Sequence, residues 1–93
     1  MVLTGNKVQD LFKKAKKNKF ALPAVNVIGS NSINATLETA AKLNSPVIIQ
    51  FSNGGAIFNA GKSLSNENQI AAIKGAVSGA KHVRELSDLY GAT

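Results

Sequence analysis

Val47-Ile48-Ile49-Gln50-Phe51-Ser52-Asn53-Gly54-Gly55 is the stretch that decides the fold of this chain. Four of its first five residues are apolar, and three of these are β-branched, which is typical of a strand buried on both faces of a parallel sheet. The pair Gly54-Gly55 allows a sharp turn or a close approach of the backbone to a ligand, because glycine has no Cβ atom. The stretch therefore predicts a buried strand that ends in a polar, glycine-rich loop.

The polar side chains at the end of this strand share a face. Strand side chains alternate between faces, so Gln50 and Ser52 point to the same side. The segment Phe20–Val27 also reads as a strand, and its Asn26 lies near the carboxyl end. Parallel α/β folds bind ligands at the carboxyl ends of their strands, so we predict that Asn26, Gln50 and Ser52 contribute to one ligand pocket.

These residues also have plainer explanations that the sequence leaves open. Asn26 would equally satisfy the backbone of a turn, and Ser52-Asn53-Gly54-Gly55 would equally form an ordinary loop between a strand and a helix.

Three further segments have the apolar periodicity of helices. They are Asn6 to about Lys17, Ser30 or Ser32 to about Leu43, and Ser65 or Asn66 to Tyr90.

Several residues mark the expected helix ends and contacts. Asn18 and Gly91 are expected carboxyl-terminal caps, because both residue types tolerate the left-handed conformation. In the last helix, Gly75 and Gly79 lie on or beside the apolar stripe and predict close packing against a neighbouring element.

The order helix, strand, helix, strand, long helix predicts an α/β fold built on a right-handed parallel βαβ unit. Two parallel strands do not close a sheet, so large apolar surfaces would stay uncovered. We interpret residues 1–93 as a single partial domain and expect a third strand after Thr93. A complete (β/α)₈ barrel would need about 250 residues.

Composition limits the kind of protein and of site. Hydrophobic residues make up 44% and charged residues 17%, which is typical of a globular chain and not of a disordered one. The absence of cysteine excludes disulfides and thiolate ligands and agrees with a cytoplasmic protein. A single histidine, His82, cannot build an ordinary zinc site, and we interpret it as a structural or surface residue.

The net charge of +6 is concentrated in one tract. Its five lysines are Lys13, Lys14, Lys16, Lys17 and Lys19. We interpret the tract as the solvated face of an amphipathic helix, although such a tract can also bind nucleic acid or an anionic surface. No aromatic residue is interleaved for base stacking, and no apolar run approaches the roughly 20 residues of a membrane span. We therefore expect neither a nucleic-acid nor a membrane partner.

Two motifs resemble those of the class II, zinc-dependent fructose-1,6-bisphosphate aldolases. They are Phe20-Ala21-Leu22-Pro23-Ala24-Val25-Asn26 and Gln50-Phe51-Ser52-Asn53-Gly54-Gly55-Ala56. Shorter segments also resemble the family: Ser32-Ile33-Asn34-Ala35, Ala60-Gly61-Lys62, Gly75-Ala76 and Gly79-Ala80. The resemblance spans nearly all 93 residues and corresponds to the amino-terminal part of a family member.

The resemblance implies a TIM barrel, of which this chain would form the first two βα units after an amino-terminal helix. It also implies a cytoplasmic, homodimeric lyase of glycolysis and gluconeogenesis. Such an enzyme reversibly cleaves fructose 1,6-bisphosphate into dihydroxyacetone phosphate and glyceraldehyde 3-phosphate, with zinc polarising the ketone and an Asp as general acid/base. In the family pattern, Asn26 and Ser52 match substrate-contacting positions, and Gln50 matches a polar neighbour.

The family's catalytic Asp and zinc ligands lie beyond the segment that this chain resembles. The resemblance therefore assigns no metal ligand and no catalytic residue here, and we expect the isolated chain to be inactive. Its expected partners are a sugar bisphosphate and the rest of the barrel or a second subunit. The alternative is a non-catalytic βαβ module that oligomerises and binds a phosphorylated ligand.

Overall fold

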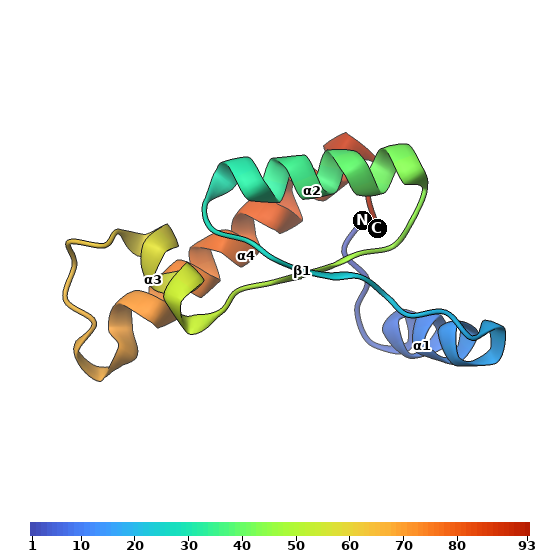
Figure 1. The fold of residues 1–93 in the computed structure, drawn as a ribbon, viewed down its shortest axis with the longest axis horizontal. Helices are drawn as coiled ribbons and strands as arrows, with labels where there is room; N and C mark the ends of the chain where they lie inside the picture. Colours follow the sequence, from blue (N-terminus) through green and yellow to red (C-terminus); the bar gives the residue numbers. More distant parts are fainter.

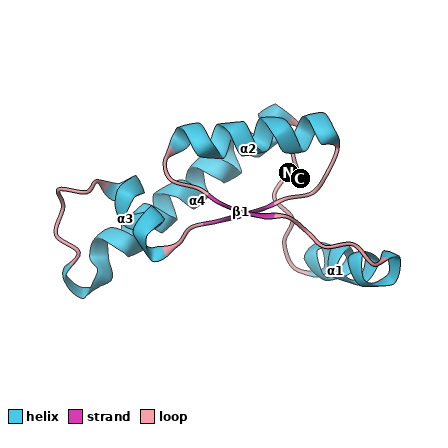
Figure 2. Ribbon diagram, in the orientation of Figure 1, coloured by secondary structure: helices cyan, strands magenta, loops and turns pink.

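The structure is a computed structural model that describes residues 1–93. Its elements are α1 (Asn6–Asn18), β1 (Ala24–Asn26), α2 (Ser30–Leu43), β2 (Ile48–Gln50), α3 (Asn53–Ala60), the 3₁₀ helix η1 (Glu67–Gln69) and α4 (Ile70–Tyr90). Figure 1 traces this order, and Figure 2 shows the two strands between helices. The predicted α/β order is confirmed, with α3 as an additional helix where a loop was expected.

The sheet consists of β1 and β2, which pair in parallel with Asn26 opposite Gln50. Two backbone hydrogen bonds extend the pairing: Ile48 N–H donates to the Pro23 carbonyl at 2.8 Å, and Val27 N–H donates to the Gln50 carbonyl at 3.1 Å. Both strands are shorter than predicted. Phe20 is excluded from β1 because its N–H still bonds to the Ala15 carbonyl at the end of α1.

One face of the sheet carries the core. The core residues are Val27, Ile33, Leu37, Ala40 and Ala92, with Val47, Ile49, Phe51, Val83, Leu86 and Tyr90 packed against them. These side chains come mainly from α2, α4 and one face of the strands, as the alternation along β2 predicts. The prediction that β2 is buried on both faces is wrong, because no helix covers the other face and Ile48 is 40% exposed.

The helix ends differ in detail from the sequence-based expectations. Asn18 belongs to α1, and the left-handed residue that ends the helix is Lys19, with φ 56°. Neither expected serine caps α2; the Ser32 hydroxyl instead accepts a hydrogen bond from Ile28 N–H at 2.8 Å in the preceding loop. At the other end of the chain, Gly91 caps α4 with φ 71°, as predicted.

The start of α4 is later than predicted. Asn68 and Gln69 have φ values of 54° and 62°, so the backbone turns out of the helical path before Ile70. Asn66 nevertheless contributes to the helix start, because its Oδ1 accepts a hydrogen bond from Ala72 N–H at 3.0 Å.

Helices α3 and α4 pack closely, as the two glycines predict. A Cβ atom on Gly75 would overlap the carbonyl oxygen of Ala56 and lie 2.7 Å from its carbonyl carbon. A Cβ atom on Gly79 would overlap the ring of Phe51. The Asn59 side chain adds a polar contact, because its Nδ2 donates to the Gly75 carbonyl at 2.8 Å. Only glycine allows α4 to approach α3 and the end of β2 this closely.

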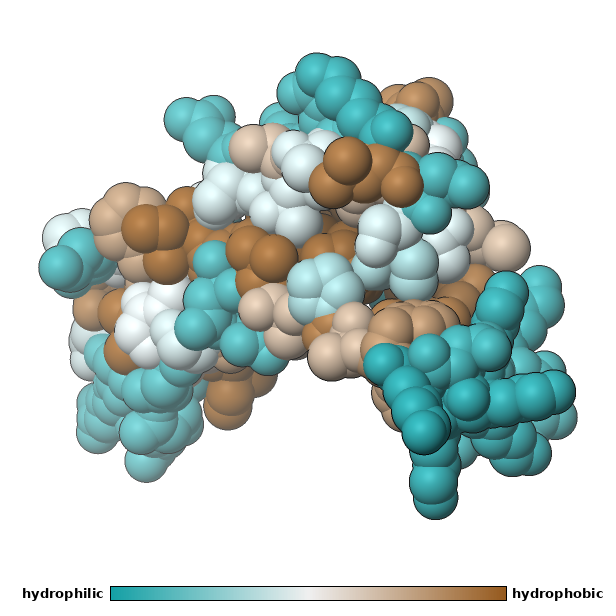
Figure 3. All heavy atoms as spheres, turned by 45° about the vertical axis from the view of Figure 1, so that its right-hand side comes forward, coloured by the Kyte–Doolittle hydropathy of each residue, from teal (hydrophilic) through white to brown (hydrophobic).

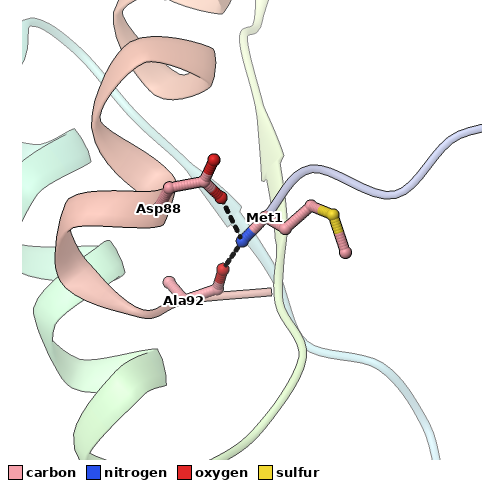
Figure 4. A network of polar contacts seen from close by, with 3 residues as sticks. All are labelled: Met1, Asp88 and Ala92. Carbon is pink, nitrogen blue, oxygen red and sulfur yellow. Dashed lines mark hydrogen bonds and ion pairs between the residues drawn. The ribbon is translucent and has the colours of Figure 1, made fainter.

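The two ends of the chain lie side by side (Figure 1). The amino group of Met1 lies 3.2 Å from Asp88 Oδ1 and donates a hydrogen bond to the Ala92 carbonyl (Figure 4). On the outer edge of β2, Val47 N–H donates to the Thr93 carbonyl at 3.0 Å. None of the helices is long and apolar enough to cross a lipid bilayer.

Much apolar surface is uncovered, as the sequence predicts for a two-stranded unit. Only 13 of 93 residues are buried, and Phe58 and Ile73 are 48% and 52% exposed. Figure 3 shows brown apolar areas that reach the surface between hydrophilic ones. A cavity of about 330 Å³ also opens between the apolar side of α1 and β2, with Leu11, Phe12, Leu22, Ile48 and Ile49 in its lining.

The contact of α4 with α3 makes a direct prediction. Gly75→Ala should lower the free energy of unfolding by about 1–3 kcal/mol, because the new methyl group overlaps backbone atoms that cannot rotate away. Urea unfolding followed by circular dichroism measures this change. The matched control is Gly54→Ala, where an added Cβ meets no heavy atom within 4 Å. The control should leave stability unchanged or raise it by up to about 1 kcal/mol. Equal stability of both variants would contradict the close packing.

Candidate functional site

The centre of the candidate site is a pair of side-chain amides at the carboxyl ends of the two strands. Asn26 and Gln50 are opposite each other in the strand register, so their side chains emerge on the same face. Gln50 Nε2 donates a hydrogen bond to Asn26 Oδ1 at 2.9 Å. Both side chains are exposed on the open face of the sheet. The two amides therefore share a face, as the alternation of strand side chains predicts, and a ligand pocket formed by Asn26, Gln50 and Ser52 stays a prediction.

This hydrogen bond fixes which polar atoms the pair presents. Asn26 Oδ1 accepts from Gln50 Nε2, which orients the Asn26 amide so that its Nδ2 is left to donate, while the Gln50 Oε1 is left to accept. A donor and an acceptor therefore lie side by side. They fit a ligand with hydroxyl and carbonyl oxygens close together. Side-chain amides do not titrate near neutral pH, so the pair can bind and orient a ligand but cannot act as an acid or a base.

Ser52 follows Gln50 by two residues but has a different local role. Its hydroxyl oxygen accepts a hydrogen bond from Gly55 N–H at 3.0 Å, and it is the amino-terminal cap of α3. A serine cap satisfies a backbone donor that the first helical turn leaves free. The stretch expected to be a loop is therefore the first turn of α3. The missed signal was Ser52 as a cap, followed by apolar residues at helical spacing.

The position of this turn explains one glycine of the pair, Gly55. A Cβ atom on Gly55 would lie 2.9 Å from the Val27 carbonyl oxygen and 3.2 Å from Ser52 Oγ. Glycine at this position therefore lets α3 begin directly against the end of β1. Gly54 has no such neighbour.

Ser52 also lines a shallow hollow that the amide pair does not reach. The hollow measures about 380 Å³ and lies between the start of α3 and the start of α4. Its lining includes Asn53, Gln69 and Ile73. The structure thus brings Asn26 and Gln50 into direct contact, and it places Ser52 beside them along the chain with its hydroxyl directed to the helix backbone.

The residues of this chain do not fit a metal site. No three His, Cys, Asp or Glu residues lie close enough together to hold an ion. The single histidine, His82, forms a 2.8 Å hydrogen bond between its Nε2 and Asn34 Oδ1. This contact joins α4 to α2, so the imidazole holds two helices together.

Comparisons with known proteins agree on one family. The family described as fructose-bisphosphate aldolase class-II matches residues 6–90. The fructose-bisphosphate aldolase of Edwardsiella ictaluri (strain 93-146) is 57% identical over 90 residues, and the class 2 fructose-bisphosphate aldolase of Escherichia coli (strain K12) is 59% identical over 91 residues. Both alignments cover 97% of this chain and 25% of the relative, so the chain spans about a quarter of the length of these relatives.

A solved structure gives the same result for the fold. A crystal structure of fructose-bisphosphate aldolase from Campylobacter jejuni superposes on this chain with a TM-score of 0.87 and 53% sequence identity. The superposition covers 97% of this chain and 25% of that one. The two-stranded unit therefore has the backbone of one part of a larger α/β protein.

The cap on α3 can be tested separately from any ligand. Ser52→Ala should lower the opening free energy at the Gly55 amide by about 1 kcal/mol, because the amide loses its only side-chain partner. Hydrogen exchange followed by NMR measures this opening at single residues. Ser63→Ala is the matched control, since Ser63 is an exposed serine in the following loop. Unchanged exchange at Gly55 in the Ser52 variant would show that the cap contributes nothing.

Proposed function

Because the chain belongs to the class II fructose-bisphosphate aldolase family, we propose that it forms part of an enzyme that reversibly cleaves fructose 1,6-bisphosphate into dihydroxyacetone phosphate and glyceraldehyde 3-phosphate. The family match over residues 6–90 carries this proposal. The chain spans a quarter of the length of its relatives, so the activity is proposed for a protein that contains this unit together with the rest of a barrel.

In this proposal, residues 1–93 are the first two βα units of a TIM barrel, preceded by α1. The first unit is β1 with α2, and the second is β2 with α4, while α3 and η1 form the connection within the second unit. The parallel pairing of β1 and β2 supports this arrangement, because a barrel of this class is built from parallel strands only.

The remainder of the barrel is the proposed partner of the uncovered apolar surface. It would cover the open face around Ile48 and fill the cavity beside α1. For the whole enzyme we propose a cytoplasmic homodimer that acts in glycolysis and gluconeogenesis. The metal cofactor of the whole enzyme would be zinc. Its ligands would lie outside this chain, because the residues present here do not fit a metal.

The role proposed for this chain in the reaction is to bind and orient substrate. Asn26 would donate to an oxygen of the dihydroxyacetone phosphate part through Nδ2, and Gln50 would hold the Asn26 amide in that orientation while accepting from a substrate hydroxyl. Ser52 would contribute its hydroxyl hydrogen, because its oxygen accepts from Gly55 N–H and its proton is free to donate. None of the three moves a proton in the reaction.

A chimeric enzyme tests the proposed function. This chain would replace the matching segment of the Escherichia coli relative, and cleavage of fructose 1,6-bisphosphate would be followed with a coupled assay. We expect activity within about tenfold of the parent enzyme, lost on addition of a chelator, whereas the 93-residue chain alone should be inactive. A folded but inactive chimera would overturn the proposal. If the isolated chain then formed a discrete dimer that bound a sugar phosphate, a non-catalytic binding module would replace the aldolase as the proposed function.

The amide pair is tested in the same chimera. Asn26→Ala and Gln50→Ala should each lower kcat/KM roughly 10- to 100-fold, the loss expected for a hydrogen bond to a charged or polarised substrate group. Gln50→Glu should cost as much as Gln50→Ala, because a carboxylate cannot donate to Asn26 Oδ1. The control is Gln9→Ala, an exposed glutamine on α1, which should change kcat/KM by less than about twofold. Full activity of the Asn26 and Gln50 variants would exclude both residues from the site.

A further inference from the structure

Helix α1 and the residues that follow it carry a dense group of lysines without partners. We define the lysine surface as Lys13, Lys14, Lys16, Lys17 and Lys19. All five are exposed, and the only buried residue of α1 is Ala15. The ion pairs of the structure join Met1 to Asp88 and Lys42 to Glu38, so none of these five lysines is neutralised by a carboxylate. The sequence contains no Asp or Glu between Asp10 and Glu38.

The lysine surface lies away from the candidate site. Helix α1 is at the amino ends of the strands, whereas Asn26 and Gln50 are at their carboxyl ends (Figure 1). In Figure 3 the hydrophilic residues of this region project outward as a separate lobe. A cationic group at this position does not contact a ligand held by the amide pair, so the aldolase function gives it no role.

An exposed aromatic ring follows the lysines. Phe20 comes directly after Lys19 and is 42% exposed, whereas Phe12 lines the cavity between α1 and β2. Lysines clustered on the polar side of an amphipathic helix are typical of segments that bind anionic phospholipids. The lysines approach anionic headgroups, and the Phe20 ring enters the interface of the bilayer.

We propose that the lysine surface, together with Phe20, binds the surface of a bilayer that contains anionic phospholipids. Charge complementarity carries the affinity, because each lysine near an anionic bilayer contributes to the attraction. A nucleic acid is the weaker candidate, since no aromatic side chain lies between Lys13 and Lys19 to stack on bases. This inference is independent of the aldolase function, and it replaces the expectation that the lysines are only solvated and that the chain has no membrane partner.

Co-sedimentation with lipid vesicles tests the proposal. The 93-residue chain should bind vesicles of phosphatidylcholine with phosphatidylserine at about 0.1 M salt and should not bind vesicles of phosphatidylcholine alone. Changing Lys13, Lys14 and Lys17 to Gln should lower the partition coefficient roughly a hundredfold. Phe20→Ala should lower it roughly fivefold, because less apolar surface enters the interface.

The matched control changes three lysines elsewhere to Gln, namely Lys62, Lys74 and Lys81. This variant has the same net charge as the first and should bind within about threefold of the unmodified chain. Equal losses in both variants would overturn the proposal, because binding would then follow net charge alone. Failure of the unmodified chain to bind anionic vesicles would also overturn it. So would tighter binding to a single-stranded RNA oligonucleotide that displaces the vesicles. Circular dichroism of each variant confirms that the fold is retained, and none of these outcomes bears on the activity of the chimera.

Discussion

The parallel pairing of β1 with β2 is the constraint on which the rest of this structure depends. The strands are only three residues long each, so a few backbone hydrogen bonds fix their register. That register places Asn26 opposite Gln50 and turns Val27 and Ile49 toward the helices. Because side chains alternate along a strand, a shift by one residue would move the amide pair into the core and the apolar residues to the open face. The site and the core are therefore set by the same contacts.

The close approach of α4 to α3 positions Ser52 relative to the two strands. With hydrogen in place of a side chain at Gly75 and Gly79, α4 contacts the backbone of α3 and the ring of Phe51. This contact holds α3 at the end of β2, where Ser52 caps it and Gly55 meets the Val27 carbonyl. The position of Ser52 relative to the amide pair thus depends on two glycines in a helix that carries no candidate site residue.

The helical spacing of apolar residues and the alternation of side chains along strands predicted the features that depend on local sequence. The order of the main elements, the shared face of Asn26 and Gln50, the glycine contacts of α4 and the cap at Gly91 follow from spacing alone. The failures have physical causes outside such patterns. Helix α3 was missed because Gly54 and Gly55 favour a loop by propensity, whereas the tertiary contact with Val27 requires glycine at position 55 inside a helix. The late start of α4 depends on Asn68 and Gln69, whose backbones are in the left-handed conformation. The spacing of apolar residues does not reveal such a conformation. The burial of β2 on one face only reflects which helices are present, not the composition of the strand.

The number of residues between two contacting side chains affects the order in which contacts form during translation. Asn26 and Gln50 are 24 positions apart, and His82 and Asn34 are 48 apart. Contacts of short range close small loops and lose little chain entropy, so they form early. A ribosome adds roughly 5–20 residues per second, which gives the strand pair time to assemble before α4 has been made. Until α4 arrives, the apolar faces of α2 and β2 are open to other nascent chains, and the speed of translation through α4 sets how long this exposure lasts.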